Sequence, residues 1–285
     1  MIALGLLFLL FAECSERIDR MKELSVREMQ QRQLAILDYI HDFCLTEGLE
    51  YILIGGALLG AVRNGKMIPW DDDIDIFMSR SDYRCFLEKF QDSDRYKLLD
   101  SSRVPEYYYP FAKVCDCGTK MSEDVSELGM RPLSCLGVGV DVFPIDDYPE
   151  NRCAAFFTTL KQRVLQGLCY KDFRYESPTR VSLPTRIALQ ACKAIMGLKG
   201  KPVNEYIRKM DQLWGGVKQG AQVIDTWTYQ CYSRDALYPL GTITLEGKSY
   251  HAPGNYDKFL TECYGADYMT PRNTQPGGHG VAYEL

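Results

Sequence analysis

The first well-patterned stretch of the chain has a helical period of apolar and polar positions. Between residues 26 and 47, apolar side chains recur at the spacing of one face of a helix. Ser25 and Glu28 have the spacing of a capping box, and Gly48 follows the last periodic position, where helices commonly end. The pattern therefore predicts an amphipathic helix whose apolar stripe faces the core.

Three short runs predict β-strands. Residues 51–54 are continuously apolar and end at a double glycine, which is typical of a buried strand that enters a tight turn. Residues 73–78 alternate between polar and apolar, and residues 138–143 form a β-rich run that we expect Pro144 to stop. Strands and helices alternate early in the chain, which predicts an α+β domain of α/β-like character with a mixed sheet flanked by helices.

Further helices are expected later in the chain, and Ser81 is the expected N-cap of one of them. The end of the chain, residues 271–285, is rich in proline and glycine and is expected to be irregular. The expected helices cover residues 57–63, 81–90, 151–170 and 255–264.

Composition divides the chain into four parts. The apolar run of residues 2–12 is too short to cross a bilayer comfortably. We therefore expect residues 1–20 to be an appendage, with translation beginning near Met21. The other parts are a catalytic core (21–150), a helical and basic subdomain (151–215) and a C-terminal segment that packs back on the core (216–285).

The charge of the chain is acidic overall but uneven. A net charge of −5 does not fit a general nucleic-acid binder. Residues 160–210 nevertheless hold eleven basic and three acidic residues, which gives this window a net charge of +8. The window is either a solvated helical face or a landing surface for an anionic polymer or a membrane. The eleven cysteines include no C-x-x-C pair, so we expect free thiols in a reducing cytosol.

Four aspartates crowd into five positions, at residues 71–73 and 75, next to segments that the pattern predicts to be buried. In a strand, Asp73 and Asp75 point to the same side, where their charges repel unless a cation lies between them. Carboxylate oxygens suit Mg²⁺ or Mn²⁺. Asp141 is also an acid within an apolar strand, so it is the expected third ligand, whereas Asp146 and Asp147 are expected in a loop.

Three other interpretations of the aspartates compete with a divalent metal site. An EF-hand calcium loop would need glycine where Ile76 stands and glutamate where Asp82 stands. A solvated acidic turn suits Asp71 and Asp72 but does not explain why Asp75 lies between two isoleucines. A glycosidase carboxylate pair usually comes from separate segments of the chain.

A second signal lies just upstream of the aspartates. Gly55 and Gly56 join a predicted strand to a predicted helix, where backbone N–H groups and the helix dipole favour an anion. Arg63 has the chemistry to pair with a phosphate. A predicted phosphate-binding site beside a predicted metal site indicates metal-dependent phosphoryl or nucleotidyl transfer.

Four blocks of sequence stand out in order along the chain: GGALLGAVR (55–63), IPWDDDIDI (68–76), VDVFPID (140–146) and YDKFLTECYGADYMTP (256–271). Together they resemble the LicD family, whose relatives include the fukutin-type phosphotransferases. The resemblance implies a nucleotidyltransferase-type fold. It also implies transfer of a phospho-alcohol group, often phosphocholine from CDP-choline, to a sugar of a cell-surface glycan or its lipid-linked precursor. We expect this reaction in the cytoplasm, at the inner face of the membrane.

Carried over by position, the resemblance implies roles for seven residues. The chain departs from the family pattern at Ala57, where many relatives have a hydroxyl side chain, and Cys115 with Cys117 does not match the zinc-binding insertion of the animal relatives. The implied metal ligands and catalytic residues are Asp73, Asp75 and Asp141, and the residues expected to border the donor phosphates are Gly55, Gly56, Arg63 and Lys113.

Two further groups of side chains are weaker candidates for a functional role. His279 is a possible helper, although a histidine in a glycine-rich loop is more often a solvated surface residue. The run Tyr107–Tyr109 is either a half-buried segment or an aromatic cage for a quaternary ammonium group. Two rival functions stay open: transfer of the NMP half of a nucleotide, and a catalytically inactive glycan-binding scaffold.

Overall fold

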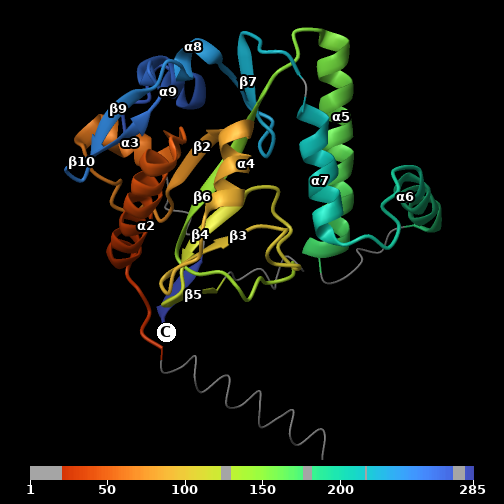
Figure 1. The fold of residues 1–285 in the computed structure, drawn as a ribbon, viewed down its shortest axis with the longest axis horizontal. Helices are drawn as coiled ribbons and strands as arrows, with labels where there is room; N and C mark the ends of the chain where they lie inside the picture. The colour runs from red at the N-terminus through yellow and green to blue at the C-terminus, as the bar shows by residue number, and fades with distance from the viewer. Residues whose placement is uncertain (1–20, 123–129, 176–181, 216, 272–279) are drawn as a thin grey trace, which may run out of the picture.

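The computed structural model describes residues 21–122, 130–175, 182–215, 217–271 and 280–285, so the expected appendage at residues 1–20 lies outside the described residues. Its centre is a seven-stranded mixed sheet in the order β1-β2-β6-β4-β3, in which β7 pairs with β6 and β8 with β7 (Figure 1). The strands of this sheet are β1 (Ile52–Leu53), β2 (Asp75–Ser79), β3 (Tyr96–Leu99), β4 (Ala112–Asp116), β6 (Gly139–Asp147), β7 (Gln222–Asp225) and β8 (Cys231–Ser233).

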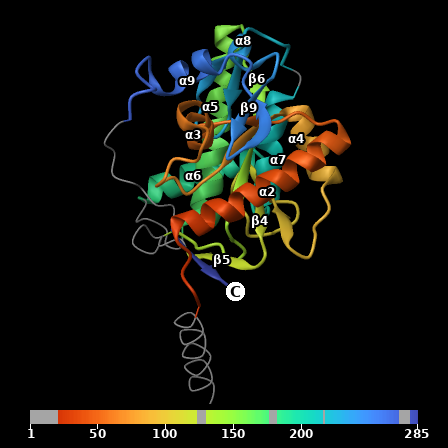
Figure 2. The same cartoon turned by 90° about the vertical axis from the view of Figure 1, so that its left-hand side faces the viewer.

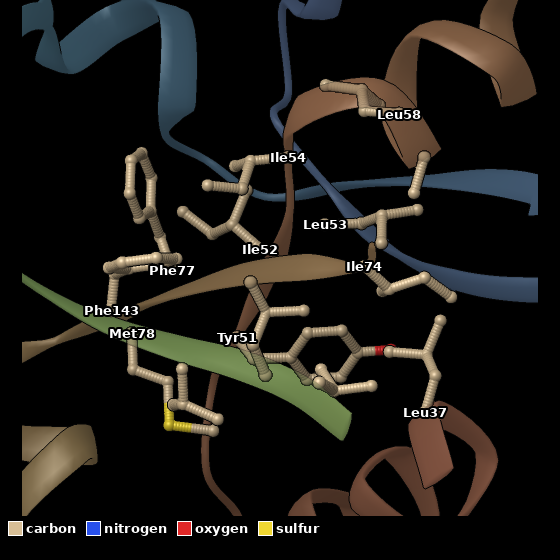
Figure 3. Packing of buried hydrophobic residues seen from close by; sticks show 14 of the residues in the cluster. Leu37, Tyr51, Ile52, Leu53, Ile54, Leu58, Ile74, Phe77, Met78 and Phe143 are labelled. Atoms are coloured by element: carbon tan, nitrogen blue, oxygen red, sulfur yellow. The ribbon is translucent and has the colours of Figure 1, made fainter. Parts of the chain in front are cut away.

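Helices flank this sheet, as the sequence predicts. Both α2 and α4 pack against β6, and Figure 2 shows α2 crossing in front of β4. The main core lies around β1 and β2, where Tyr51, Leu53 and Ile76 are fully or almost fully buried (Figure 3). The helices are α2 (Val26–Glu47), α3 (Gly55–Asn64), α4 (Arg80–Lys89), α5 (Arg152–Cys169), α6 (Leu183–Ile195), α7 (Val203–Trp214), α8 (Arg234–Leu237) and α9 (Tyr256–Tyr264), with a π-helical turn at Tyr170–Arg174.

The long strand β6 organises the sheet, and it corrects the expectation that Pro144 ends the strand. On one side β6 runs parallel to β2, with Asp75 opposite Asp141 and Met78 opposite Pro144. On its other side β6 pairs first with β4, up to Val142, and then with β7, from Ile145. Pro144 falls in the gap between these two partners, where the missing N–H of proline breaks no ladder bond. Asp146 and Asp147 therefore lie in a strand and not in a loop.

Most helix boundaries agree with the sequence signals. The capping box is present, because the Ser25 hydroxyl accepts from the Glu28 N–H and the Glu28 carboxylate accepts from the Ser25 N–H at 2.9 Å. The helices α5 and α9 begin where expected, and Asn151 and Asn255 are their N-caps. The predicted cap Ser81 is wrong, since β2 ends at Ser79 and the Ser79 hydroxyl accepts from the Asp82 N–H at 3.1 Å.

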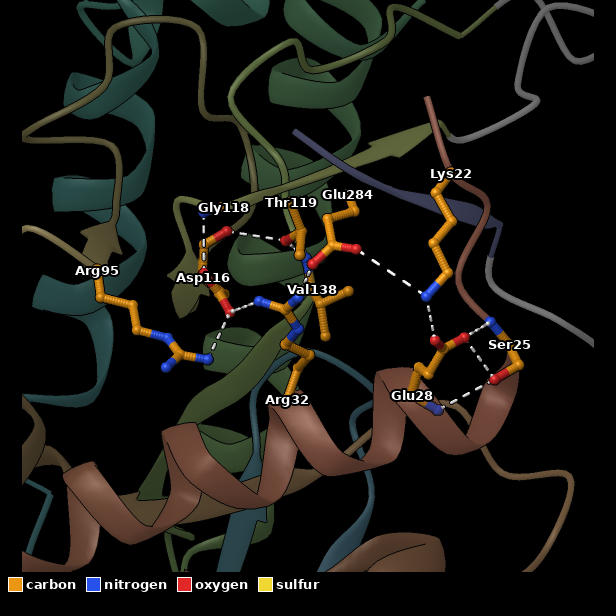
Figure 4. Close-up of polar contacts among 10 residues, drawn as sticks. All are labelled: Lys22, Ser25, Glu28, Arg32, Arg95, Asp116, Gly118, Thr119, Val138 and Glu284. Carbon is orange, nitrogen blue, oxygen red and sulfur yellow. Dashed lines mark hydrogen bonds and ion pairs between the residues drawn. The ribbon is translucent and has the colours of Figure 1, made fainter. Parts of the chain in front are cut away.

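Residues 271–285 were expected to be irregular, but the last described residues among them form strand β11 (Val281–Glu284), which pairs with β5 (Thr119–Ser122). The opposite edge of β11 contacts the start of the chain, where the Leu24 N–H donates to the Ala282 carbonyl at 2.8 Å. The Arg32 guanidinium on α2 joins Asp116 to Glu284 (Figure 4). The two ends of the described chain are therefore fixed to each other and to the core.

Helices dominate residues 152–214, the region expected to form a basic subdomain. Buried residues of α5 and α7 form a second core cluster with Tyr107, Tyr108 and Leu133. The amphipathic helix α6 lies beyond this pair, on the side away from the sheet (Figure 1), and none of its residues is buried. A two-stranded hairpin, β9 (Gly241–Leu245) and β10 (Lys248–Ala252), precedes α9 on the other side of the molecule.

Candidate active site

The structure brings most of the predicted site residues to one pocket of about 480 Å³ at the ends of β2, β4 and β6. The parallel pairing of β2 and β6 sets Asp75 directly opposite Asp141, and the antiparallel pairing of β4 and β6 sets Lys113 opposite Asp141 on the other side. Asp73 and Gly55 also line this pocket. Neighbouring strands are about 5 Å apart, so the sheet places Asp75, Asp141 and Lys113 in one row.

The lysine in this row already neutralises one aspartate. The Lys113 ammonium lies 2.9 Å from Oδ1 of Asp141, and both side chains are less than one-fifth exposed. Burial lowers the pKa of Lys113, but Asp141, through its charge and its hydrogen bond, together with Cys115 and Asp75 raises the pKa above its ordinary value. Lys113 is therefore a positively charged group of the pocket wall that is paired with Asp141.

Helix α2 positions the loop that carries the aspartates. The Gln30 side-chain amide donates to the carbonyls of Ile68 and Asp71, both at 2.8 Å. The buried Gln33 amide donates to the carbonyl of Asp72 at 2.6 Å. The sequence pattern treats this helix only as a core element, and no local signal marks these two glutamines, because their partners lie about forty residues away.

The two glycines are needed because aspartates approach them closely. Gly55 is the first residue of α3 and has a left-handed φ of +65°, and a Cβ there would lie 3.2 Å from Oδ2 of Asp75. A Cβ at Gly56 would lie only 1.9 Å from Oδ2 of Asp71. The start of α3 thus already faces carboxylates, which its dipole and free N–H groups favour. A contact of Gly56 with the donor phosphates stays a prediction.

Arg63 lies outside the pocket lining, at the far end of α3. Its guanidinium donates to the backbone carbonyls of Tyr268 and Thr270, so it fixes the segment that follows α9. The structure therefore does not bring Arg63 together with the other predicted site residues. A contact between Arg63 and the donor phosphates stays a prediction that this placement does not favour.

The chemistry of the aspartates fits a divalent cation in kind, since all the donors are hard carboxylate oxygens. In the part of the chain that the structure describes, however, no group of three His, Cys, Asp or Glu side chains is arranged to hold a metal ion. Asp141 already contacts the Lys113 ammonium, so a cation site here needs these side chains to rearrange. Metal binding therefore stays a prediction.

Another part of the pocket wall is aromatic and was largely missed from the sequence. Tyr109, Phe111 and Trp227 line it, whereas Tyr107 and Tyr108 are buried in the second core cluster. Tyr109, Phe111 and Lys113 stand at alternate positions of the chain, a signal that the sequence does contain. Trp227 follows β7, more than a hundred residues later, so only the fold brings it here. His279 lies outside the described residues.

A mixed sheet that lines one pocket with aspartates, a lysine and a glycine-started helix defines a nucleotidyltransferase-type domain. The family model "LicD/FKTN/FKRP, nucleotidyltransferase domain" matches residues 48–123, which include β1 to β5 and all of the predicted site residues except Asp141. The chain is also 39% identical over 267 residues to the lipopolysaccharide cholinephosphotransferase LicD of Haemophilus influenzae, covering 87% of this chain and 93% of that protein. This chain belongs to the LicD family.

Proposed function

We propose that this protein transfers phosphocholine from CDP-choline to a sugar hydroxyl of a cell-surface glycan or its lipid-linked precursor. The observation that carries the proposal is the pairing of Asp75, Asp141 and Lys113 in one pocket of a LicD-family chain. The relative from Haemophilus influenzae, which is named as a lipopolysaccharide cholinephosphotransferase, supports phosphocholine and a glycan acceptor. The acids and the buried lysine argue against the rival interpretation as an inactive glycan-binding scaffold.

In the proposed reaction the acceptor oxygen bonds to the phosphorus of phosphocholine, the bridging P–O bond breaks, and CMP leaves. Lys113 would contact the oxygens of the donor diphosphate, with Asp141 holding the ammonium in place. One of the three aspartates would take the proton of the sugar hydroxyl. Gly55, at the start of α3, would border the donor phosphates.

We further propose that Asp73, Asp75 and Asp141 hold Mg²⁺ or Mn²⁺ when the donor binds. Such an ion would neutralise the charge of the diphosphate and of the departing CMP. Removal of divalent ions with a chelator should then abolish transfer, and addition of Mg²⁺ should restore it. Full activity in chelator would overturn the metal proposal without touching the assignment of the donor.

Product analysis tests the proposed reaction. With choline-labelled CDP-choline and lipopolysaccharide as acceptor, we expect free CMP and label in the glycan. Release of pyrophosphate from a nucleoside triphosphate, with the NMP group on the acceptor, would instead support the rival nucleotidyl transfer. CMP without label on the glycan would contradict transfer to a sugar.

The Asp75→Asn substitution tests the site. It removes one carboxylate charge and almost no volume, so the fold should be kept and turnover should fall by roughly a hundredfold or more. Circular dichroism and thermal unfolding would check the fold, and labelled transfer would check the activity. Wild-type turnover in a folded Asp75→Asn variant would mean that Asp75 is not part of the site.

We also propose that the reaction takes place at the cytoplasmic face of a membrane. All ten cysteines in the described part of the chain are free thiols, which is typical of a reducing compartment. Within the described residues, no helix combines the length and apolar character that a membrane span requires. The exposed apolar side chains of α6, in a basic window, support peripheral contact with an anionic lipid surface or glycan acceptor.

A further inference from the structure

The aromatic part of the pocket has the geometry of a cation-binding box. The ring of Trp227 stands nearly perpendicular to the other two, at 73° to Phe111 and 75° to Tyr109. The ring centroids of Phe111 and Trp227 are 5.1 Å apart, and those of Tyr109 and Phe111 are 5.0 Å apart. We call these three residues the aromatic box. Rings that meet at such angles form two walls against which a rounded cation can lie.

The aromatic box is held in place by β6 and by the end of β7. Phe111 is 6% exposed and packs on Phe143 of β6, with ring centroids 4.4 Å apart. The Asp225 carboxylate, at the end of β7, accepts from the backbone N–H of Trp227 at 2.8 Å and from the Thr228 hydroxyl at 2.6 Å. Asp225 is itself buried and lines the pocket, so it adds an acidic group beside the rings.

The aromatic box and the charged row are joined by one segment of the chain. Lys113 lies in β4, whereas Tyr109 and Phe111 lie in the bent segment just before it, and all three line the pocket. Two residues of backbone span at most about 7 Å, so Phe111 and Lys113 lie within that distance of each other along the chain. A ligand whose phosphate contacts Lys113 would therefore place a group at the end of a short linker against the rings.

We propose that the aromatic box binds the trimethylammonium group of the phosphocholine donor and selects it over donors with other alcohols. This inference rests on the proposed function. The faces of aromatic rings attract cations, and a quaternary ammonium, which has no N–H to bond with water or carboxylates, depends on them most. An Arg174 guanidinium 5.9 Å from the Tyr109 centroid shows that a cation is already accommodated beside this ring, from a residue outside the pocket lining.

The test compares Trp227→Leu with Trp227→Phe, which keeps an aromatic face. Binding of CDP-choline, CDP-ethanolamine and CMP would be measured by calorimetry on the full chain. The Leu variant should bind CDP-choline roughly three- to thirtyfold more weakly and leave CMP binding unchanged, whereas the Phe variant should keep most of the preference for choline. Tyr256→Leu, an exposed aromatic position outside the pocket lining, is the matched control and should change nothing.

Three results would overturn the inference. The first is a Trp227→Leu variant that keeps the wild-type preference for choline over ethanolamine. The second is an equal loss of CMP and CDP-choline affinity, which would mean that Trp227 supports the pocket as a whole and does not recognise the choline group. The third is a Trp227→Phe variant as impaired as Trp227→Leu.

Free phosphocholine and phosphoethanolamine separate this inference from the proposed function. Binding of phosphocholine that depends on Trp227, without any transfer from CDP-choline, would support the aromatic box and contradict the proposed reaction. Transfer from CDP-choline with no dependence of donor preference on Trp227 would support the reaction and contradict the box.

Discussion

At the scale of single residues, three glycines of α3 lie against different groups, either a carboxylate or the backbone of a loop. Gly55 has a left-handed backbone and lies against Asp75, while Gly56 has an ordinary backbone and is required by the carboxylate of Asp71. Gly60, one turn later in α3, lies against backbone, since a Cβ there would be 2.4 Å from the carbonyl oxygen of Lys66. A side-chain end can move aside, but the backbone of a folded loop cannot do so at small cost.

This difference predicts that Gly56→Ala lowers mainly the transfer activity and that Gly60→Ala lowers the free energy of unfolding. Gly56→Ala should displace the Asp71 carboxylate, change the free energy of unfolding by less than about 1 kcal/mol, and reduce transfer activity. Gly60→Ala should lower the free energy of unfolding by about 1–3 kcal/mol, because the loop backbone must shift. Denaturant titration together with the transfer assay would check both variants. Equal losses of stability would contradict the geometry.

At the scale of elements, strand β6 and the helices around it hold the pocket together. A buried network ties them, since Arg80 at the start of α4 donates to Asp146 of β6 at 3.0 Å and to Asp211 of α7 at 2.7 Å. Burial raises the pKa of Asp211 even though Arg80 opposes it, so the acid depends on the arginine to stay charged. Asp146 is 4% exposed. This network joins the sheet to the helical layer of residues 152–214.

Loss of the Arg80 guanidinium should therefore be costly. Arg80→Met leaves the Asp146 carboxylate buried without its partner, and the free energy of unfolding should fall by about 3–5 kcal/mol. Lys89→Met, at the other end of α4, is a matched control. It removes an exposed ion pair with Glu47 and should cost less than about 1 kcal/mol. Denaturant titration of the two variants would check this ranking, and similar losses would contradict it.

At the scale of the whole molecule, helix α6 stands apart from the sheet with an unusual surface. Leu183, Ile187 and Ile195 are 69%, 62% and 85% exposed. They belong to the window of residues 160–210, whose net charge is +8 in a chain of net charge −5. Exposed apolar side chains within a stretch of positive net charge match an anionic lipid surface, where both the burial of apolar area and electrostatic attraction favour binding.

Vesicle binding tests this proposal on the full chain. We expect co-sedimentation with vesicles that contain anionic lipid, weaker binding to zwitterionic vesicles, and a loss of binding at high salt. Ile187→Glu should weaken binding several-fold, whereas Leu45→Glu, at a similarly exposed position of α2, should not. Equal binding by the two variants would mean that α6 is not the contact surface.

The sequence by itself determined the elements whose signals are local. The capping box of α2, the starts of α5 and α9 and the buried run at β1 follow from neighbouring residues. The strand expected at residues 73–78 begins only at Asp75, so Asp73 lies in the loop before β2. Motif blocks supplied the family. These features depend on short-range hydrogen bonds and on the periodicity of apolar positions, which a sequence displays directly.

Only the tertiary structure decided how distant segments meet. It set Asp141 beside Asp75 and Lys113, carried β6 through Pro144 between two successive partners, and turned Arg63 away from the pocket to hold the segment after α9. It also brought Trp227 to Phe111, because β4 and β7 pair one after the other with the same side of β6. Strand order and register depend on the burial of whole faces against each other. The contacts that result join residues far apart in the chain, so the sequence around each residue does not show its partner.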